Sequence, residues 1–349
     1  MRCLALADEL RTRGANCLFV CRQLEGNLIE HIRSEGFCCR VLTKPRQIDC
    51  FLDEAPVHHS HWLEVSWQTD AAETIDFLED ASIDWLIVDH YALDARWEKM
   101  LRPHVCWMMA IDDLADRFHD CDLLLDQNLI SGRSEQYKQK LPDGCKTLLG
   151  PQYSLLRPNF RELRACVSPR IAPIRNILAY FGASDSYNLT GRAVSAFLKL
   201  RRSDIKFTVV LNSNCLFVNE VREMVKFQKN IRLLNGVPSL APLMLQADLA
   251  IGASGTTSWE RCCLGLPSLV ISVADNQKPI AAELHRHQLV CWLGHYDDVT
   301  ETVISDALRD VLATQDLEEW SRACMEVTDG EGSRRVAEAL YCPEMLVEV

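Results

Sequence analysis

The sequence predicts an α/β fold made of two doubly wound, Rossmann-like domains, each a parallel sheet with helices on both faces. Short apolar runs without polar alternation, such as residues 85–88 and 268–272, are typical of strands buried on both faces. Amphipathic stretches of helical length separate these runs. At 349 residues the chain is too long for one ordinary core, which also favours two domains.

The first half begins this alternation at once. The predicted strands are residues 17–21, 37–42, 85–88, 106–111 and 123–125, and the predicted helices are 24–35 and 71–78. Residues 1–160 are assigned to an N-terminal domain. Pro151, Pro158, Pro169 and Pro173 interrupt the rhythm, and we expect the interdomain linker in that stretch.

The second half, residues 161–349, repeats the pattern as a C-terminal domain. The predicted strands are residues 176–181, 206–211, 231–234, 249–252 and 268–272. The predicted helices follow residue 185 up to Leu200 and then cover 218–227, 240–245, 256–264, 280–287 and 303–313. Two consecutive doubly wound domains predict a cleft lined by the loops at the carboxyl ends of both sheets.

The composition of the chain limits the classes of ligand and partner that we expect it to bind. The formal net charge of −12 argues against nucleic acid, but a single diphosphate needs only backbone N–H groups at a helix start. The 16 cysteines occur singly or as adjacent pairs with no C-x-x-C, so we expect reduced, small apolar residues and no metal site. No signal-peptide core and no run of 18 apolar residues are visible. We therefore expect a cytoplasmic protein that binds neither a membrane nor a cofactor.

The most informative motif is ASGTTSWERCCLGLPSLVISVADNQ, residues 253–277. A strand stops before Ser254 and Gly255, and a helix starts at Thr256 or Thr257. Gly255 lets the backbone approach a ligand, and the three hydroxyls can face phosphate. Glu260 follows as a candidate acceptor for ribose hydroxyls. An ordinary capping box explains the same residues equally simply.

Three further turns follow predicted strands in the second half. FGASDSYNLT, with Gly182 leaving the strand, is either a phosphate- or sugar-facing turn or a well-capped connection to a helix. Val237 lies in the Asn-Gly-Val-Pro turn, where backbone groups can pair with a base edge. Asn276 adds an amide after the strand at 268–272.

In the first half, Asp89, His90 and Tyr91 end one strand, and Asp112 and Asp113 end the next. A His or Tyr at a strand end can transfer protons in a cleft, while a hydrogen-bonded structural cluster is the plainer interpretation. The paired carboxylates are consistent with metal or acid/base chemistry, although a helix cap is more common.

Together these segments resemble a known family. VDHYALD, IDDLADRFHDCDLLLDQN, GPQYSLLRPNF, FGASDSYNLT, ASGTTSWERCCLGLPSLVI and ADNQ occur in its order between residues 88 and 277. The chain is similar to the UDP-2,4-diacetamido-2,4,6-trideoxy-β-L-altropyranose hydrolases of pseudaminic acid biosynthesis and flagellin glycosylation, from residue 1 to about Val336.

The resemblance implies a GT-B fold and an inverting cleavage by water, without metal, at the anomeric carbon of a UDP-sugar. By motif, residues 254–257 would hold the diphosphate, Glu260 the ribose and Val237 the uracil. Tyr91 and Asn276, from opposite domains, would face the sugar. A GT-B glycosyltransferase and a UDP-sugar-binding relative without turnover remain as alternatives.

The start of the chain departs from the family pattern. Family members carry a Gly-rich loop ending in Gly-His directly before a Met-Arg that matches Met1 and Arg2, and that histidine is their catalytic base. Residue 1 already lies in a predicted helix without an N-cap residue. Because doubly wound domains begin with a strand, we expect that the first strand of the N-terminal domain is missing and that the start codon is misplaced. By the family's pattern, which the chain resembles, the real start would lie about 20 residues upstream. A natural truncation that keeps only UDP binding is the alternative.

Overall fold

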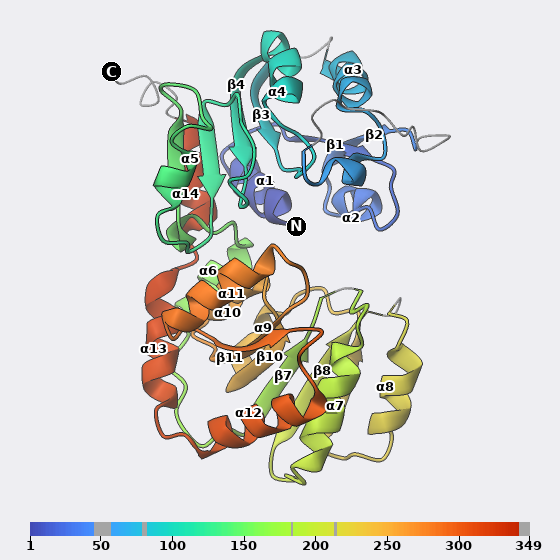
Figure 1. The fold of residues 1–349 in the computed structure, drawn as a ribbon, viewed down its shortest axis with the longest axis vertical. Helices are drawn as coiled ribbons and strands as arrows, with labels where there is room; N and C mark the ends of the chain where they lie inside the picture. Colours follow the sequence, from blue (N-terminus) through green and yellow to red (C-terminus); the bar gives the residue numbers. More distant parts are fainter. Residues whose placement is uncertain (45–56, 79–81, 183, 213–214, 342–349) are drawn as a thin grey trace. The chain divides into compact units, whose positions relative to one another are not determined.

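The computed structural model describes residues 1–44, 57–78, 82–182, 184–212 and 215–341. The chain divides into two compact units (Figure 1). Unit 1 contains Met1–Arg157 and the segment that begins at Gly332, and unit 2 is Pro158–Glu331. The passage from unit 1 to unit 2 falls inside the proline-rich stretch expected as the linker.

The expected boundary after residue 160, with everything beyond it in the second domain, needs correction. The last helix, α14 (Gly332–Tyr341), packs against α1 (Arg2–Thr12) in unit 1. Its Val336 and Ala337 are fully buried there in one cluster with Leu6 and Ile111. The apolar stripe of this helix therefore completes the core of the first unit.

Unit 1 is built from parallel strands in two separate sheets. β1 (Leu18–Arg22) pairs with β2 (Cys38–Leu42), and β3 to β6 form a four-stranded sheet in chain order. The strands of that sheet are β3 (Ile83–Val88), β4 (Val105–Ile111), β5 (Leu123–Asp126) and β6 (Lys146–Leu149). The connecting helices are α2 (Ile29–Ser34), η1 (Ser60–Leu63), α3 (Trp67–Leu78), α4 (Ala95–Leu101), η2 (Arg102–His104), α5 (Arg133–Tyr137) and η3 (Pro151–Tyr153).

Unit 2 is a doubly wound domain with one six-stranded parallel sheet in the order β12-β11-β10-β7-β8-β9. The strands are β7 (Asn176–Tyr180), β8 (Lys206–Leu211), β9 (Ile231–Asn235), β10 (Leu249–Ala253), β11 (Ser268–Ser272) and β12 (Cys291–His295). The helices are α6 (Pro158–Arg164), α7 (Leu189–Lys199), α8 (Val218–Val225), α9 (Ala241–Gln246), α10 (Thr257–Cys263), α11 (Gln277–Arg286), α12 (Glu301–Ala313) and α13 (Leu317–Val327).

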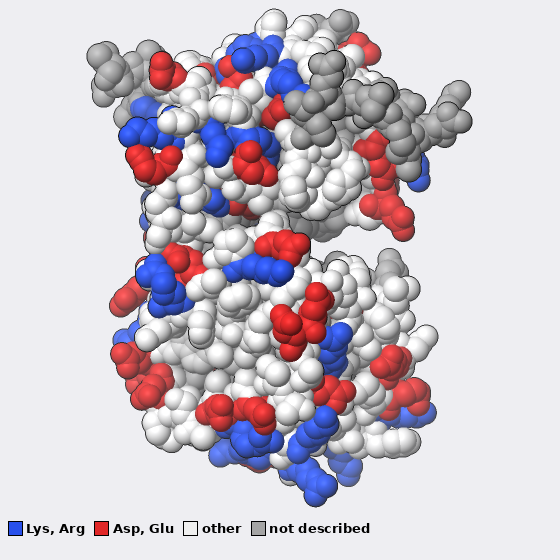
Figure 2. Space-filling view, in the orientation of Figure 1, with Lys and Arg blue, Asp and Glu red and all other residues white. Residues whose placement is uncertain are grey.

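Burial explains why the apolar runs become strands. All five residues of β11 and all four of β5 are buried, as expected for central strands covered on both faces. On the face of each unit that Figure 2 shows, acidic and basic side chains are interspersed. In the part of the chain that the structure describes, no helix combines the length and apolar character needed to cross a bilayer.

Candidate functional site

The strand order of unit 2 creates a switch point between β7 and β10. From β7 the chain proceeds through β8 to β9 on one side, and from β10 it proceeds through β11 to β12 on the other. The loops that leave these two neighbouring strands therefore diverge, and ligands of doubly wound sheets bind in the crevice at such a point. Gly182, with φ of +97°, lies in the first loop, and residues 254–257 form the second. Ala183, beside Gly182, lies outside the described residues.

The β10–α10 loop presents hydroxyl groups that the fold itself does not use. Ser254 is 1% exposed, and its Oγ has no hydrogen-bond partner among the described residues. Thr256 occupies the N-cap position of α10 without making a side-chain capping bond. A capping box was one interpretation of this motif, but Thr256 does not form it. A buried, unpaired hydroxyl is costly and is expected to have a ligand or water as its partner.

Two residues that sequence reasoning did not single out hold this loop in place. Arg261 is 3% exposed and donates from Nη2 to the Ala253 carbonyl and to Ser258 Oγ, both at 3.0 Å. Gly252 permits the close approach of β10 to β7, because a Cβ there would lie 2.2 Å from the Tyr180 carbonyl oxygen. Arg261 stands inside the quoted motif and Gly252 directly precedes it, but only the tertiary contacts show their roles.

Glu260 lies on α10 near the same switch point. Burial raises the pKa of Glu260 to about 7, although the neighbouring Arg261 opposes the shift. The pKa of Tyr180, the last residue of β7, is raised by burial and by Glu260. A half-buried carboxyl that titrates near neutrality fits a group whose hydrogen-bond partner is a ligand.

Asn276 and Val237 lie along the same edge of the sheet but on different loops. Asn276 is at the N-cap position of α11, after β11, and its side chain makes no capping bond. The next residue, Gln277, brings its Nε2 to 3.7 Å from the position of a Cβ on Gly255, so the Asn276 loop adjoins the β10–α10 loop. Val237 follows β9 at the far edge of the sheet, after Gly236.

Residues 184–190, by contrast, connect β7 to α7 as a capped turn. Asp185 is 5% exposed and accepts from the backbone N–H groups of Leu189 and Thr190, each at 2.9 Å. Asn188, at the N-cap of α7, accepts from Gly191 N at 3.1 Å. The plainer of the two interpretations of this motif therefore holds for Asp185 and Asn188.

In unit 1, Tyr91 follows β3 in an aromatic and charged environment. Its ring centroid lies 5.6 Å from those of His59 and Trp62, and the Arg117 guanidinium carbon lies 5.8 Å from it. Burial and the nearby Asp113 raise the pKa of the Tyr91 phenol. The phenol is therefore protonated at neutral pH and is suited to donating a hydrogen bond.

The other acidic residues at this edge form structural ion pairs. Arg2 donates to Asp89 at 2.6 Å and to Asp113 at 3.0 Å. Burial alone would raise the pKa of Asp89, but the Arg2 guanidinium lowers it below its usual value. Sequence reasoning did not foresee the role of Arg2, because its partners lie far away in the chain.

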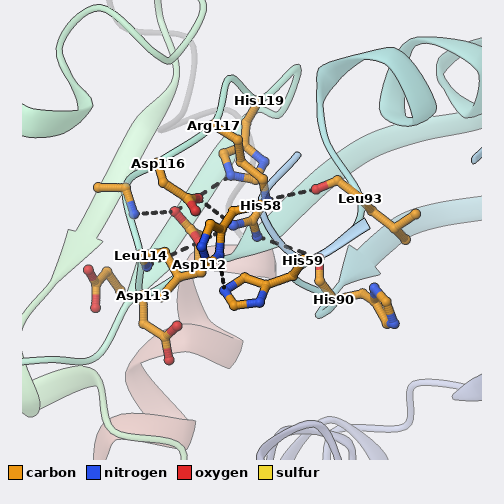
Figure 3. Close-up of polar contacts among 12 residues, drawn as sticks. His58, His59, His90, Leu93, Asp112, Asp113, Leu114, Asp116, Arg117 and His119 are labelled. Atoms are coloured by element: carbon orange, nitrogen blue, oxygen red, sulfur yellow. Dashed lines mark hydrogen bonds and ion pairs between the residues drawn. The ribbon is translucent and has the colours of Figure 1, made fainter. Parts of the chain in front are cut away.

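Asp112 belongs to a buried network with Arg117 and His119 (Figure 3). Arg117 Nη1 lies 2.9 Å from Asp112 Oδ1, and His119 Nδ1 lies 2.8 Å from Glu98 Oε1. Burial would lower the pKa of His119, but the carboxylates of Asp112 and Glu98 raise it to about 9. Asp112 also accepts from Ala115 N at 3.0 Å, so it closes the loop as a cap. Within the described ranges, no cluster of three His, Cys, Asp or Glu side chains could hold a metal ion.

Solved structures show the fold to which these loops belong. The crystal structure of MurG from Acinetobacter baumannii is similar over 97% of this chain and 95% of its own, with a TM-score of 0.64 and 12% identity. UGT89C1 from Arabidopsis thaliana, complexed with UDP, is similar over 97% and 95%, with a TM-score of 0.66 and 13% identity. The chain has the GT-B fold of these enzymes.

No family model matches the chain, but it is similar in sequence to several known proteins. It is 24% identical to the UDP-2,4-diacetamido-2,4,6-trideoxy-β-L-altropyranose hydrolase of Campylobacter jejuni, over 61% of this chain and 74% of the relative. It is also similar to the spore coat polysaccharide biosynthesis protein SpsG of Bacillus subtilis, 27% identical over 55% of this chain, and to the uncharacterized protein MJ1062 of Methanocaldococcus jannaschii, 24% identical over 79%. The chain spans 57% and 53% of the lengths of these two relatives.

Proposed function

We propose that this protein binds a UDP-sugar and cleaves its anomeric C–O bond with water, releasing UDP and the free sugar. The observation that carries the proposal is the buried, unpaired Ser254 hydroxyl at the switch point of unit 2. The name of the Campylobacter jejuni relative supplies the substrate class. The exact sugar is part of the proposal, with a 2,4-diacetamido-2,4,6-trideoxy hexose as the first candidate.

In this proposal the nucleotide lies along the carboxyl edge of the unit 2 sheet. Ser254, Gly255, Thr256 and Thr257 bind the diphosphate through backbone N–H and hydroxyl donors. Gly182, whose positive φ turns the chain away from β7, leaves room for it. Glu260 accepts from the ribose hydroxyls, and Val237 meets the uracil through its backbone.

The proposed reaction exchanges one C–O bond for another. A water oxygen attacks the anomeric carbon, the bond to the UDP oxygen breaks with its electron pair, and the proton of the water passes to a base. Tyr91 and Asn276 are proposed to contact the sugar. Because the raised pKa of Tyr91 keeps its phenol protonated, we assign it hydrogen-bond donation to a sugar oxygen, not proton abstraction.

Calorimetry of UDP binding tests the nucleotide site. Glu260→Ala should weaken UDP binding by about 1–3 kcal/mol, the scale of lost hydrogen bonds to a charged group. Glu319→Ala, an exposed position at the start of α13, is the matched control and should bind UDP like the wild type. Unchanged affinity in Glu260→Ala would remove Glu260 from the site.

Product analysis tests the reaction and separates it from a second candidate. The relative SpsG is named for polysaccharide biosynthesis, which favours a glycosyltransferase as the alternative. A hydrolase yields free sugar and UDP without an acceptor, a transferase yields a glycosylated acceptor, and a binding protein returns the UDP-sugar unaltered. Asn276→Ala should lower turnover more than UDP affinity; the reverse result would show that its assigned role is wrong.

A further inference from the structure

Unit 1 contains a pocket whose lining residues include neither Tyr91 nor any residue of the proposed nucleotide site, although its Arg117 lies 5.8 Å from the Tyr91 ring. Its volume is about 520 Å³, within the range of small-molecule sites. Three segments line it: Val57 and His58; Asp94 to Arg96 at the start of α4; and Asp116 to Phe118 in the β4–β5 loop. The last two segments are joined by a backbone hydrogen bond from Ala95 N to the Phe118 carbonyl at 2.9 Å.

Arg117, one of the residues that line this pocket, is held in place by hydrogen bonds and ion pairs on several sides. Arg117 is 5% exposed and donates from Nε to the Leu93 carbonyl at 2.8 Å. Its Nη1 lies 2.9 Å from Asp112 and 3.0 Å from Asp116 (Figure 3). A site whose polar groups are held before the ligand arrives loses little entropy on binding.

The carboxylate and guanidinium groups that line the pocket form ion pairs with one another. The Asp94 carboxylate accepts a hydrogen bond from Arg96 Nε at 2.9 Å, and Asp116 forms an ion pair with Arg117. A phosphate or another anion would have to compete with Asp94 and Asp116, and a cation with Arg96 and Arg117. The pocket therefore favours a neutral ligand that offers hydroxyl donors to the carboxylates and acceptors to the guanidinium groups.

Phe118 adds an aromatic face that the fold does not require. Its side chain is 63% exposed, although its neighbours Arg117 and His119 are each 5% exposed and ion-paired. The neighbours of Phe118 thus fix the backbone of the loop, while Phe118 itself lines the pocket and is largely exposed to solvent. A single exposed aromatic residue is ordinary on a protein surface. Beside a pocket that also contains charged side chains, it offers a face for the C–H side of a ring ligand.

We propose that this pocket binds a neutral saccharide, with one face of the sugar ring against Phe118 and its hydroxyl or acetamido groups on Asp94, Arg96 and Asp116. The proposal does not rest on the nucleotide site of unit 2. The saccharide has two possible sources, a free sugar or the sugar of a nucleotide-sugar, and both share this chemistry.

Ligand-observed NMR on the full chain tests the pocket. The probes are a panel of neutral sugars (glucose, rhamnose, N-acetylglucosamine and N-acetylgalactosamine), each offered up to about 20 mM, which covers the weak affinities typical of small ligands. At least one should bind the wild type, and Phe118→Ala should weaken that binding about two- to tenfold, the scale of one aromatic contact. Absence of binding by the whole panel overturns the proposal.

Two further variants separate this pocket from other causes. Phe227→Ala removes an aromatic side chain of unit 2 that is 84% exposed, and it should leave sugar binding unchanged. Asp116→Asn keeps Arg117 paired with Asp112 and should weaken the same sugar. Unfolding temperatures of all variants should match that of the wild type, because the substituted side chains are surface groups. Equal weakening by Phe118→Ala and Phe227→Ala, or none by Phe118→Ala, contradicts the assignment.

Competition identifies the source of the sugar. If saturating UDP-N-acetylglucosamine leaves free-sugar binding intact, the pocket binds a separate saccharide. If UDP-N-acetylglucosamine binds more tightly than UDP, and Phe118→Ala removes that gain but preserves UDP affinity, the sugar of the nucleotide-sugar occupies the pocket. Failure of UDP to bind, with sugar binding retained, would count against the proposed function alone.

Discussion

The carboxyl group of Glu260 is held in an environment that disfavours its charge. Burial raises its pKa from 4.5 to about 7, so between these values the folded protein keeps a proton that the unfolded chain releases. The contribution of Glu260 to the free energy of unfolding therefore becomes less favourable as pH rises through this window.

Glu260→Gln should accordingly raise the free energy of unfolding of unit 2 by about 1–2 kcal/mol at pH 8. A change of one pKa unit corresponds to about 1.36 kcal/mol, and we expect only part of this because the side chain is half-buried. At pH 5.5 the gain should be smaller. Urea unfolding at both pH values measures the difference. A gain that is independent of pH would show that Glu260 is not the titrating group.

The environment of His119 has the opposite effect from that of Glu260, because it stabilises the charged form of the side chain. Its pKa of about 9, against 6.5 for a free histidine, means that its stabilisation is fully present below pH 6.5 and is lost as pH rises through 9. His119→Gln should lower the free energy of unfolding by about 3 kcal/mol at pH 6, since it also leaves Glu98 buried without a cation. The loss should shrink toward pH 9.5.

Thermal unfolding across that pH range checks the His119 prediction. His287→Gln is the control, because His287 lies 3.7 Å from Glu283 at an exposed position. Its effect on the unfolding temperature should be near zero at every pH. A constant destabilisation by His119→Gln would mean that packing, not charge, explains the role of this residue.

At the residue scale, strand ends were predictable and buried partners were not. Ser254, Thr256 and Gly182 follow apolar runs, so their place at a carboxyl edge could be read from the chain. His119 contacts Glu98, which lies 21 positions earlier in the chain, and Arg117 contacts Leu93, which lies 24 positions earlier. Nothing in local spacing encodes such a pairing.

The close contact of β7 and β10 sets the geometry of the candidate nucleotide site. Gly252→Ala would place a Cβ 2.2 Å from the Tyr180 carbonyl oxygen, which belongs to the backbone and cannot rotate away. The two strands must move apart, at a cost of about 1–3 kcal/mol for an overpacked core. Because the β10 and β7 loops would also shift, UDP affinity should fall.

Differential scanning calorimetry with and without UDP measures both effects of Gly252→Ala. Gly255→Ala is the matched control for stability, since a Cβ there meets only Gln277 Nε2 at 3.7 Å. We expect Gly255→Ala to keep the unfolding temperature of the wild type. Wild-type stability in Gly252→Ala would show that the strands tolerate the methyl group.

Central strands were predicted well, whereas two of the edge strands were missed. β8 and β11 match the expected bounds because their apolar runs are continuous. β6 and β12 were not predicted, because each lies at the edge of its sheet and most of its residues are only half-buried. The helix expected from residue 24 begins at Ile29, since Gly26 has φ of +74° and Asn27 Oδ1 accepts from Ile29 N.

On the scale of the whole molecule, the order of the chain does not match the order of the units. Unit 2 is one continuous segment, whereas unit 1 needs both ends of the described chain. The amphipathic pattern of α14 shows that it requires an apolar partner, but a pattern cannot say which one. Residues 161–349 were assigned to one domain for that reason.

Deleting the chain after Glu331 should therefore destabilise unit 1 and spare unit 2. The deletion removes Val336, Ala337 and Leu340 from the unit 1 core, together with the carbonyl of Leu340 that accepts from Trp85 Nε1 at 2.9 Å. Loss of the buried valine and leucine alone costs about 3–6 kcal/mol. That is a large fraction of the stability of a single domain.

Fluorescence of Trp85 and Trp107, whose ring centroids lie 5.9 Å apart in unit 1, measures the unfolding of unit 1. UDP calorimetry measures whether unit 2 keeps its binding site. The shortened chain should lose the cooperative transition seen by these tryptophans, and residues 158–331 expressed alone should bind UDP with the affinity of the full chain. Leu340→Ala should show an intermediate loss in unit 1 only. If UDP affinity falls with the deletion although unit 2 remains folded, the nucleotide site does not belong to unit 2 alone, and the roles proposed for residues 254–257 would need groups from unit 1.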